Sequence, residues 1–271
     1  MKVSIKIVFL CILCICIAKN SFASYELNKK EIKQSQIFVE SIQKTINENN
    51  PSYKKVWEDK FENLLNRSEK GSRSHALMSQ ILQLTYKIDL SGYKNSHYKK
   101  FNIDKNKIEK YWLDIHNRER NKVGLFNYQS HKRLENTATQ WSYDNYEKLT
   151  MDHKRDVGDS FYNYHKIENW FQKRGVSCPV KGRTTASESI GHFGFYCFDG
   201  ECSDEFNASV QKIFDIYMAE KGLPYPQDAH YRAIVSPHIS QLGLGVTFYE
   251  TDEKNYYEYY MATHYCTELK K

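Results

Sequence analysis

After its first two dozen residues, the 271-residue chain has no apolar run long enough to cross a membrane. It also has little net charge, because the formal value of +6 falls to +3 once the three lysines of residues 1–23 are set aside. A charge of that size does not indicate a nucleic-acid partner. No HExxH sequence and no nucleophile motif is present, so the sequence carries no signature of a known hydrolase mechanism. The length suits one large or two modest domains.

The first segment has the pattern of a secretory signal peptide. Lys2 and Lys6 precede a continuous apolar run over residues 7–18, and small residues around Ala23 predict cleavage there. A membrane anchor is the alternative, although the run is short for a bilayer span. We therefore expect residues 1–23 to be removed and the protein to be secreted or periplasmic.

Few cysteines remain after this leader: Cys178, Cys197, Cys202 and Cys266. An even number in an exported chain favours two disulfides. Four cysteines allow three pairings, and the sequence does not choose among them. Cys197 and Cys202 have the spacing of half a zinc site, but no second such pair lies near them.

Residues 24–104 have the pattern of a small all-helical N-terminal region. Three sets of apolar residues recur there with helical spacing and are separated by turn-forming segments. The sets predict three amphipathic helices and no catalytic pattern. They comprise Ile37, Phe38, Ile42 and Ile46; Trp57, Phe61, Leu64 and Leu65; and Leu77, Ile81, Leu82 and Tyr86.

Residues 105–271 combine helical stripes with runs typical of strands, which indicates an α+β fold. Four strand-like runs cover residues 192–198, 230–235, 242–250 and 256–266. Residues 229–246 are interpreted as a short strand, a turn at Pro237 and a second strand. Helices mostly precede strands, and this order favours a central antiparallel sheet covered by helices.

Two ionisable residues lie at the ends of predicted elements near the carboxyl end of the chain. The apolar stripe of a helix around residues 206–217 continues to Glu220, at a helix end where the macrodipole disfavours negative charge. His230 follows ten residues later, so the two side chains can meet. A solvated helix end is the alternative for Glu220. His153 and Glu188 are further candidates, each weak when considered alone.

Six segments, taken in order, resemble the CAP superfamily, which comprises cysteine-rich secretory proteins, antigen 5 and plant pathogenesis-related 1 proteins. The first contains the His-Asn pair of that family, followed three residues later by Arg120. The likeness extends over residues 106–266 and leaves residues 24–104 uncovered. The segments are LDIHNRERNKVGL, RLENTATQWSYDN, MDHKR, SESIG, SVQKIFDIYMAEKG and AHYRAIVSPHISQLGLGV.

The resemblance implies an α-β-α sandwich with one open cleft lined by a tetrad of His153, Glu188, Glu220 and His230. It implies that His153 and His230 face each other and bind a divalent metal ion, most readily zinc. The glutamates would orient or charge-balance the imidazoles. Two protein ligands are fewer than a tight zinc site has, so weak and exchangeable binding is expected.

The sequence departs from the family pattern beside the tetrad but keeps its four positions. Ser187 and Ser189 flank the first glutamate in place of glycine and asparagine, and Tyr217 replaces a tryptophan. Ala229 and Ser236 stand where glycine and tryptophan are usual. These changes affect the shape of the cleft more than its chemistry.

Three functions follow from the resemblance and the composition. The first is binding of a small apolar ligand, such as a lipid or sterol, or of an extracellular or host protein. The second is metal-dependent hydrolysis by the same tetrad. In the third, the domain is a scaffold and the function lies in residues 24–104. Tyrosines at 256, 257, 259 and 260 suit an apolar or carbohydrate surface, or are core and edge residues of a strand.

Overall fold

The computed structural model describes residues 25–49, 52–90, 103–178, 187–198 and 200–267. The predicted signal peptide therefore lies outside the described residues. Among these residues, 25–49 and 53–88 form one compact unit and 89–267 belong to a second.

Three helices make up the first unit: α2 (Lys29–Asn49), α3 (Ser52–Arg67) and α4 (Arg73–Tyr86). The prediction of three helices in this region is confirmed. The apolar stripes of α2 and α3 meet in an aromatic contact, because the ring of Phe38 packs edge-on against Phe61 at 5.9 Å and against Trp57 at 6.3 Å. Ser72 caps α4 by accepting a hydrogen bond from the main-chain N–H of His75.

The second unit contains a four-stranded sheet with the order β1-β3-β4-β2. Its strands are β1 (Gln129–Ser130), β2 (Ser187–Tyr196), β3 (Gln241–Glu250) and β4 (Tyr256–Cys266). β4 pairs antiparallel with both β2 and β3, as predicted, whereas the two-residue β1 pairs parallel with β3 and was not predicted. β2 is consequently an edge strand of the sheet.

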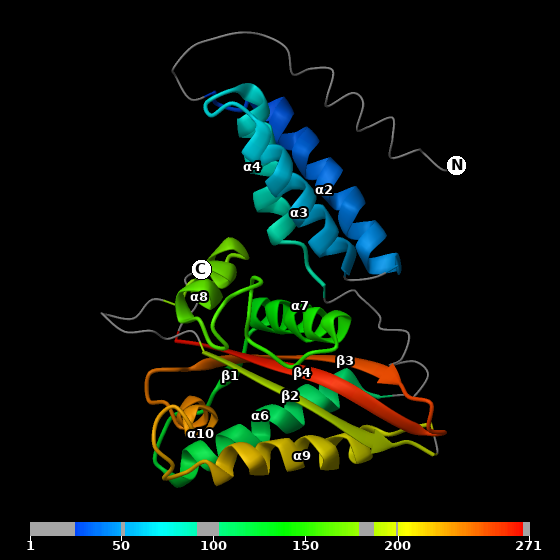
Figure 1. Cartoon of the computed structure of the whole chain (residues 1–271), viewed down its shortest axis with the longest axis vertical. Helices are drawn as coiled ribbons and strands as arrows, with labels where there is room; N and C mark the ends of the chain where they lie inside the picture. The colour runs from blue at the N-terminus through cyan, green and yellow to red at the C-terminus, as the bar shows by residue number, and fades with distance from the viewer. Residues whose placement is uncertain (1–24, 50–51, 91–102, 179–186, 199, 268–271) are drawn as a thin grey trace. The chain divides into compact units, whose positions relative to one another are not determined.

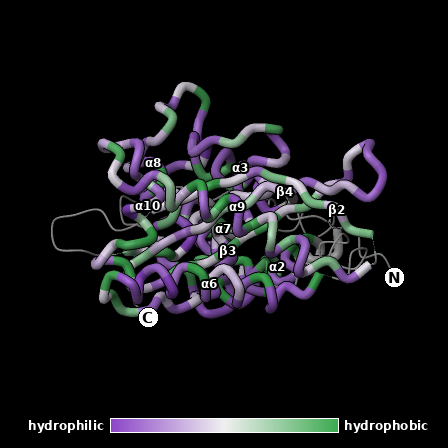
Figure 2. Tube along the Cα trace, turned by 90° about the horizontal axis from the view of Figure 1, so that it is seen from below, coloured by the Kyte–Doolittle hydropathy of each residue, from purple (hydrophilic) through white to green (hydrophobic). Residues whose placement is uncertain are grey.

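Helices cover both faces of this sheet and give an α-β-α sandwich (Figure 1). α7 (Lys132–Lys148) packs on one face, and α6 (Lys105–Lys122) and α9 (Ser203–Ala219) pack on the other. Along α6, hydrophobic and hydrophilic residues alternate with the helical period, as the green and purple segments of Figure 2 show. α8 (Tyr164–Lys173) completes the layer that holds α7.

The strand predicted at residues 229–235 is wrong, because Ala229–Ile234 form the short helix α10. Its apolar run resembles a buried strand, but tertiary contacts fix a helix instead. The Glu220 carboxylate accepts hydrogen bonds from the main-chain N–H groups of His230 and Tyr231 at the start of α10. Arg120 binds the carbonyl of Ile234 at its other end.

Both disulfides expected from the cysteine count are present. Cys178 is bonded to Cys266 at the end of β4, and Cys197 is bonded to Cys202 across a short loop. The first bond ties the segment after α8 to the sheet, and the second ties the end of β2 to the start of α9. The half zinc site considered for Cys197 and Cys202 is thereby excluded.

Two glycines of β3 let α7 lie close to the sheet. A methyl group on Gly243 would overlap the backbone nitrogen of Glu135, and one on Gly245 would overlap that of Thr139. The backbone of a packed helix cannot move aside at low cost.

We expect Gly245→Ala to lower the free energy of unfolding by about 1–3 kcal/mol, because it overpacks the contact with α7. Gly191→Ala in β2 is the matched control, since its methyl group would meet the side chains of Ile213 and Met261 rather than a backbone. Urea denaturation of both variants measures the difference. Equal losses of unfolding free energy in the two variants would contradict this explanation of the β3 glycines.

His116 of α6 makes the stability of the fold depend on pH. Its ring is buried, its Nδ1–H donates to the carbonyl of Trp112 at 2.8 Å, and its Nε2 accepts from the hydroxyl of Tyr265 at 3.0 Å. Burial lowers the pKa of His116 from 6.5 to about 3. As the pH falls, the imidazole of His116 therefore takes up a proton at a higher pH in the unfolded chain than in the folded protein.

The stability contributed by neutral His116 is complete above about pH 6.5 and is lost as the pH falls toward 3, at about 1.4 kcal/mol per pH unit. We expect His116→Phe to flatten the dependence of unfolding free energy on pH by about that slope between about pH 6 and 4. His238→Phe, at an exposed position, should leave the slope unchanged. Urea denaturation across this range tests the expectation, which an unaltered slope in His116→Phe would refute.

Candidate functional site

The loop after α7 and the start of β2 bring together two of the predicted site residues. His153 Nδ1 lies 2.8 Å from Glu188 Oε1, and both side chains are buried. Glu188 is the second residue of β2, not a residue just before the strand as the sequence indicated. Because a carboxylate only accepts hydrogen bonds, Nδ1 of His153 carries the proton. Its Nε2 has no hydrogen bond within the described part of the chain.

Glu188 also accepts hydrogen bonds from two side chains that the sequence analysis missed. Arg155 Nη2 donates to Oε2 at 2.5 Å, Arg155 Nη1 donates to Oε1 at 3.2 Å, and His264 Nε2 donates to Oε2 at 2.8 Å. Together with His153, these donors fill the roughly four acceptor positions of a carboxylate. Glu188 therefore orients its neighbours and has no lone pair left for a metal ion or for proton transfer.

The charge on Glu188 is maintained by these same neighbours. Burial by itself raises the pKa of a carboxyl group, but the Arg155 guanidinium and the hydrogen bonds from His153 and His264 overcome that effect. The pKa of Glu188 consequently lies well below its ordinary value of 4.5. This carboxylate is a permanent negative charge at the centre of the cluster.

Arg155 is itself fixed between two aromatic rings. Its guanidinium carbon lies 3.4 Å from the ring centre of Trp141 in α7 and 4.7 Å from that of Trp170 in α8. Cation–π contacts of this kind hold an arginine in one orientation as well as stabilising it. The loop that carries His153 is thus anchored to both helices through Arg155.

His264 reaches Glu188 because the two residues are paired across β2 and β4. Burial lowers the pKa of His264, and the neighbouring Glu188 only partly offsets this effect. The neutral ring donates from Nε2 to Glu188 and accepts at Nδ1 from the hydroxyl of Thr137, 2.8 Å away. The contact between His264 and Glu188 follows from the register of β2 and β4, which the sequence did not provide.

The second pair joins the end of α9 to the start of α10. Glu220 Oε1 lies 2.5 Å from His230 Nδ1, and Glu220 Oε2 accepts from the main-chain N–H of His230 at 2.9 Å. The same argument places the proton of His230 on Nδ1, and its Nε2 has no hydrogen bond to any described residue. Glu220 is partly exposed and, unlike Glu188, keeps acceptor capacity.

Tyr217 links the two pairs. Its ring stacks on His230 with centroids 4.2 Å apart and planes 8° apart, and its hydroxyl donates to the carbonyl of Ile190 at 2.6 Å. Ile190 is two residues along β2 from Glu188. The His153–Glu188 pair lies on the α7 side of this edge strand, whereas α9 and α10 bring His230 and Glu220 to it from the other side.

Exposed apolar residues surround His153. The ring centres of Phe161 and Tyr162 lie 5.2 Å and 4.8 Å from that of His153. Both residues belong to the segment between α7 and α8, which also exposes Leu149, Met151 and Val157. Apolar residues gathered in one exposed segment are typical of a surface that contacts a ligand or partner.

The family comparison identifies the second unit. The family model described as Cysteine-rich secretory protein family, CAP, matches residues 113–266, which is more than half of the chain. The chain belongs to the CAP family. The α-β-α sandwich expected from the resemblance is the fold of this CAP domain.

Several solved structures resemble the CAP domain in fold, whereas the curated proteins gave no match. The protein MpPR-1i is 15% identical, with 62% of this chain and 93% of that chain covered and a TM-score of 0.38. An outer surface protein of Borrelia burgdorferi is 14% identical, covering 61% and 97%, with a TM-score of 0.38. The CAP domain of enterococcal PrgA is 12% identical, covering 79% and 80%, with a TM-score of 0.39.

The described part of the CAP domain lacks the donor set of a tight metal site. Nowhere in the described ranges do three or more His, Cys, Asp or Glu side chains gather in a way that could hold a metal ion. His153 and His230 each have an Nε2 atom that could bind a metal ion. Glu220 has a carboxylate oxygen that can accept a further interaction. No helix among the described residues is long and apolar enough to span a bilayer.

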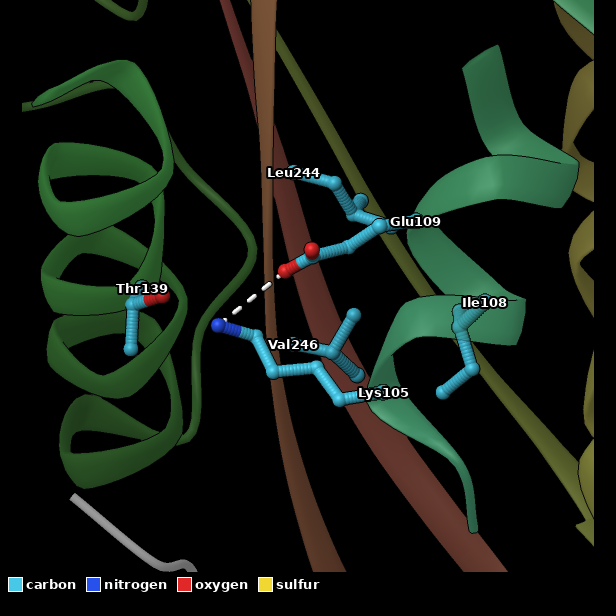
Figure 3. Close-up of a pocket in the computed structure, with 6 residues that line it drawn as sticks. All are labelled: Lys105, Ile108, Glu109, Thr139, Leu244 and Val246. Carbon is cyan, nitrogen blue, oxygen red and sulfur yellow. Dashed lines mark ion pairs between the residues drawn. The ribbon is translucent and has the colours of Figure 1, made fainter. Parts of the chain in front are cut away.

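A small cavity of the CAP domain is lined by none of these paired residues (Figure 3). Its volume of about 10 Å³ has room for about one water molecule. The Lys105–Glu109 ion pair of α6 crosses it beside Leu244 and Val246 of β3, as the dashed line in Figure 3 shows. Burial raises the pKa of Glu109 here, although Lys105 opposes the shift. The cavity is too small for an organic ligand.

Proposed function

We propose that this protein is an exported CAP-domain protein that binds a divalent metal ion weakly, zinc most readily, through His153 and His230. One observation supports the proposal above others: each imidazole is held at Nδ1 by a glutamate and has an unengaged Nε2. Carboxylate–histidine pairs of this kind are the usual way in which proteins orient a metal-binding nitrogen. When bound, the ion would supply a positive charge at the imidazoles that hold it.

We further propose that the domain acts by binding an apolar ligand or another extracellular protein rather than by catalysis. The exposed apolar residues next to His153 support this part, since they provide contact area beside the polar groups. No described side chain near the pairs has the arrangement of an activated nucleophile. Hydrolysis by a metal-bound water remains the second candidate, supported by the spare acceptor capacity of Glu220.

Zinc titration of the metal-free protein should give binding heat and shifts of the His153 and His230 ring signals in NMR spectra. His153→Ala and His230→Ala should each weaken zinc binding by about tenfold or more, because each removes one of two nitrogen ligands. His238→Ala, at an exposed position eight residues from His230, is the control and should bind zinc as the parent does. Absence of heat and of histidine shifts in the folded parent protein would refute the metal site.

A further inference from the structure

An aromatic surface lies on the α7 side of the sheet, at the end opposite the paired residues. Strand register places Tyr196 of β2 beside Tyr256 of β4, and the two ring centres are 4.9 Å apart. Phe198, two residues after Tyr196, stacks on it with ring centres 5.7 Å apart and planes 4° apart. We call Tyr196, Phe198, Tyr256, Glu253 and Glu258 the Tyr196 surface.

The rings of this surface present flat apolar faces to solvent. Phe198 is 69% exposed although one of its faces packs on Tyr196, so the other face is open. The phenol end of Tyr256 lies over Gly194, because a methyl group at that position would overlap its hydroxyl group and ring. Exposed aromatic rings that lie next to one another, unlike a single exposed ring, are typical of a surface that contacts a ligand or partner.

Cys197, the residue before Phe198, is held by two interactions. Cys197, between Tyr196 and Phe198, is bonded to Cys202 at the start of α9 and is buried. The main-chain N–H of Cys197 also donates to the carbonyl of Asn255, in the turn before β4. Rings held in place before binding lose little conformational entropy on contact with a ligand.

Hydrogen-bond acceptors border the rings. The hydroxyl of Tyr196 donates to the Glu253 carboxylate, and the hydroxyl of Tyr249 donates to that of Glu258. His192 Nε2 lies 3.0 Å from Glu258 Oε2 and completes this rim. A carboxylate has about four acceptor positions, so Glu253 and Glu258 can accept further hydrogen bonds.

From these features we propose that the Tyr196 surface binds a neutral glycan. A pyranose ring has a flat C–H face that packs on an aromatic ring, and hydroxyl groups around its edge that donate to carboxylates. Tyr196 and Phe198 are nearly parallel and Tyr256 is inclined by 53° to Tyr196, so the open face of Phe198 offers a flat contact for a sugar ring. The proposal concerns a surface separate from the metal site and does not depend on it.

A polysaccharide pull-down tests the proposal with the full protein. Insoluble cellulose, chitin and β-1,3-glucan are the probes, and lysine-coated beads are the cationic comparison. We expect retention on at least one polysaccharide and at least about tenfold weaker retention of the double variant Tyr196→Ala with Phe198→Ala, since two ring contacts are lost. Phe126→Ala is the control: it removes a ring that is 92% exposed, near β1 at the other end of the sheet.

Each outcome of the pull-down either supports or overturns the glycan site. Retention of the parent and of Phe126→Ala, with loss in the double variant, supports the glycan site. No retention on any polysaccharide, equal retention of the double variant, or retention on lysine-coated beads alone overturns it. Circular dichroism of the double variant establishes that both exposed substitutions leave the fold intact.

Discussion

Replacing Arg155 with methionine should lower the free energy of unfolding by about 3–5 kcal/mol. The side chains of Arg155 and Glu188 are 4% and 0% exposed, so the variant leaves a buried carboxylate without its charged partner. Methionine still fills part of the space between Trp141 and Trp170, which makes the missing charge the main change. Urea denaturation measures the loss, and Lys154→Met, one residue away, should change stability by less than about 0.5 kcal/mol.

A double-mutant cycle distinguishes the lost charge pair from lost packing. Glu188→Gln alone leaves Arg155 buried and unpaired, so it should also be strongly destabilising. The double variant Arg155→Met with Glu188→Gln removes both charges, and it should be more stable than the sum of the single losses predicts by about 2 kcal/mol or more. Additive losses would show that the ion pair does not contribute as the geometry indicates.

Acidification gives an independent test of the same pair. In the parent protein the pKa of Glu188 is depressed, so its stabilising contribution is present above about pH 4.5 and is lost as the pH falls below that value. In Arg155→Met the desolvated carboxyl group should have a raised pKa, because burial is then opposed by the two imidazoles alone. The variant should therefore recover part of its deficit relative to the parent as the pH is lowered.

The sequence predicted the helices of both units and three of the four strands because their apolar periodicities extend over many residues. It failed at α10, where six residues are too few for periodicity to distinguish a helix from a buried strand. There the outcome depends on Glu220 and Arg120, which bind the two ends of the helix from other elements. Contacts from other elements cannot be recognised in the local sequence pattern of a short helix.

Sequence reasoning likewise found some residues of the candidate site and missed others. The resemblance supplied His153, Glu188, Glu220 and His230, and the structure pairs each histidine with one glutamate. It supplied neither Arg155 nor His264, although both contact Glu188. Arg155 stands within the matched segment MDHKR, but its role requires the β2 register, and His264 requires the pairing of β2 with β4. The alternatives for the tyrosines separate by position along β4, since Tyr259 and Tyr260 are buried and Tyr256 and Tyr257 are half-buried.

Arg120→Met should be about as destabilising as Arg155→Met, at about 3–5 kcal/mol, for a different reason. Arg120 is buried in α6 and donates to four main-chain carbonyls and no carboxylate. The acceptors are those of Phe126, Ile234, Ser236 and Ile239. Methionine would leave these acceptors unpaired in the interior, where each costs about 1–3 kcal/mol unless water reaches it.

The loss caused by Arg120→Met should extend to the proposed metal site, which distinguishes it from a general loss of packing. Arg120 holds the carbonyls at and after the end of α10, and His230 stands near the start of that helix. At a temperature where Arg120→Met is still folded, its zinc affinity should fall by about tenfold, with a shifted His230 ring signal and an unshifted His153 signal. Arg118→Met, on the exposed side of the same helix, should change neither stability nor zinc affinity. A stable variant, or a destabilised one with unaltered zinc binding, would show that Arg120 does not position the second pair.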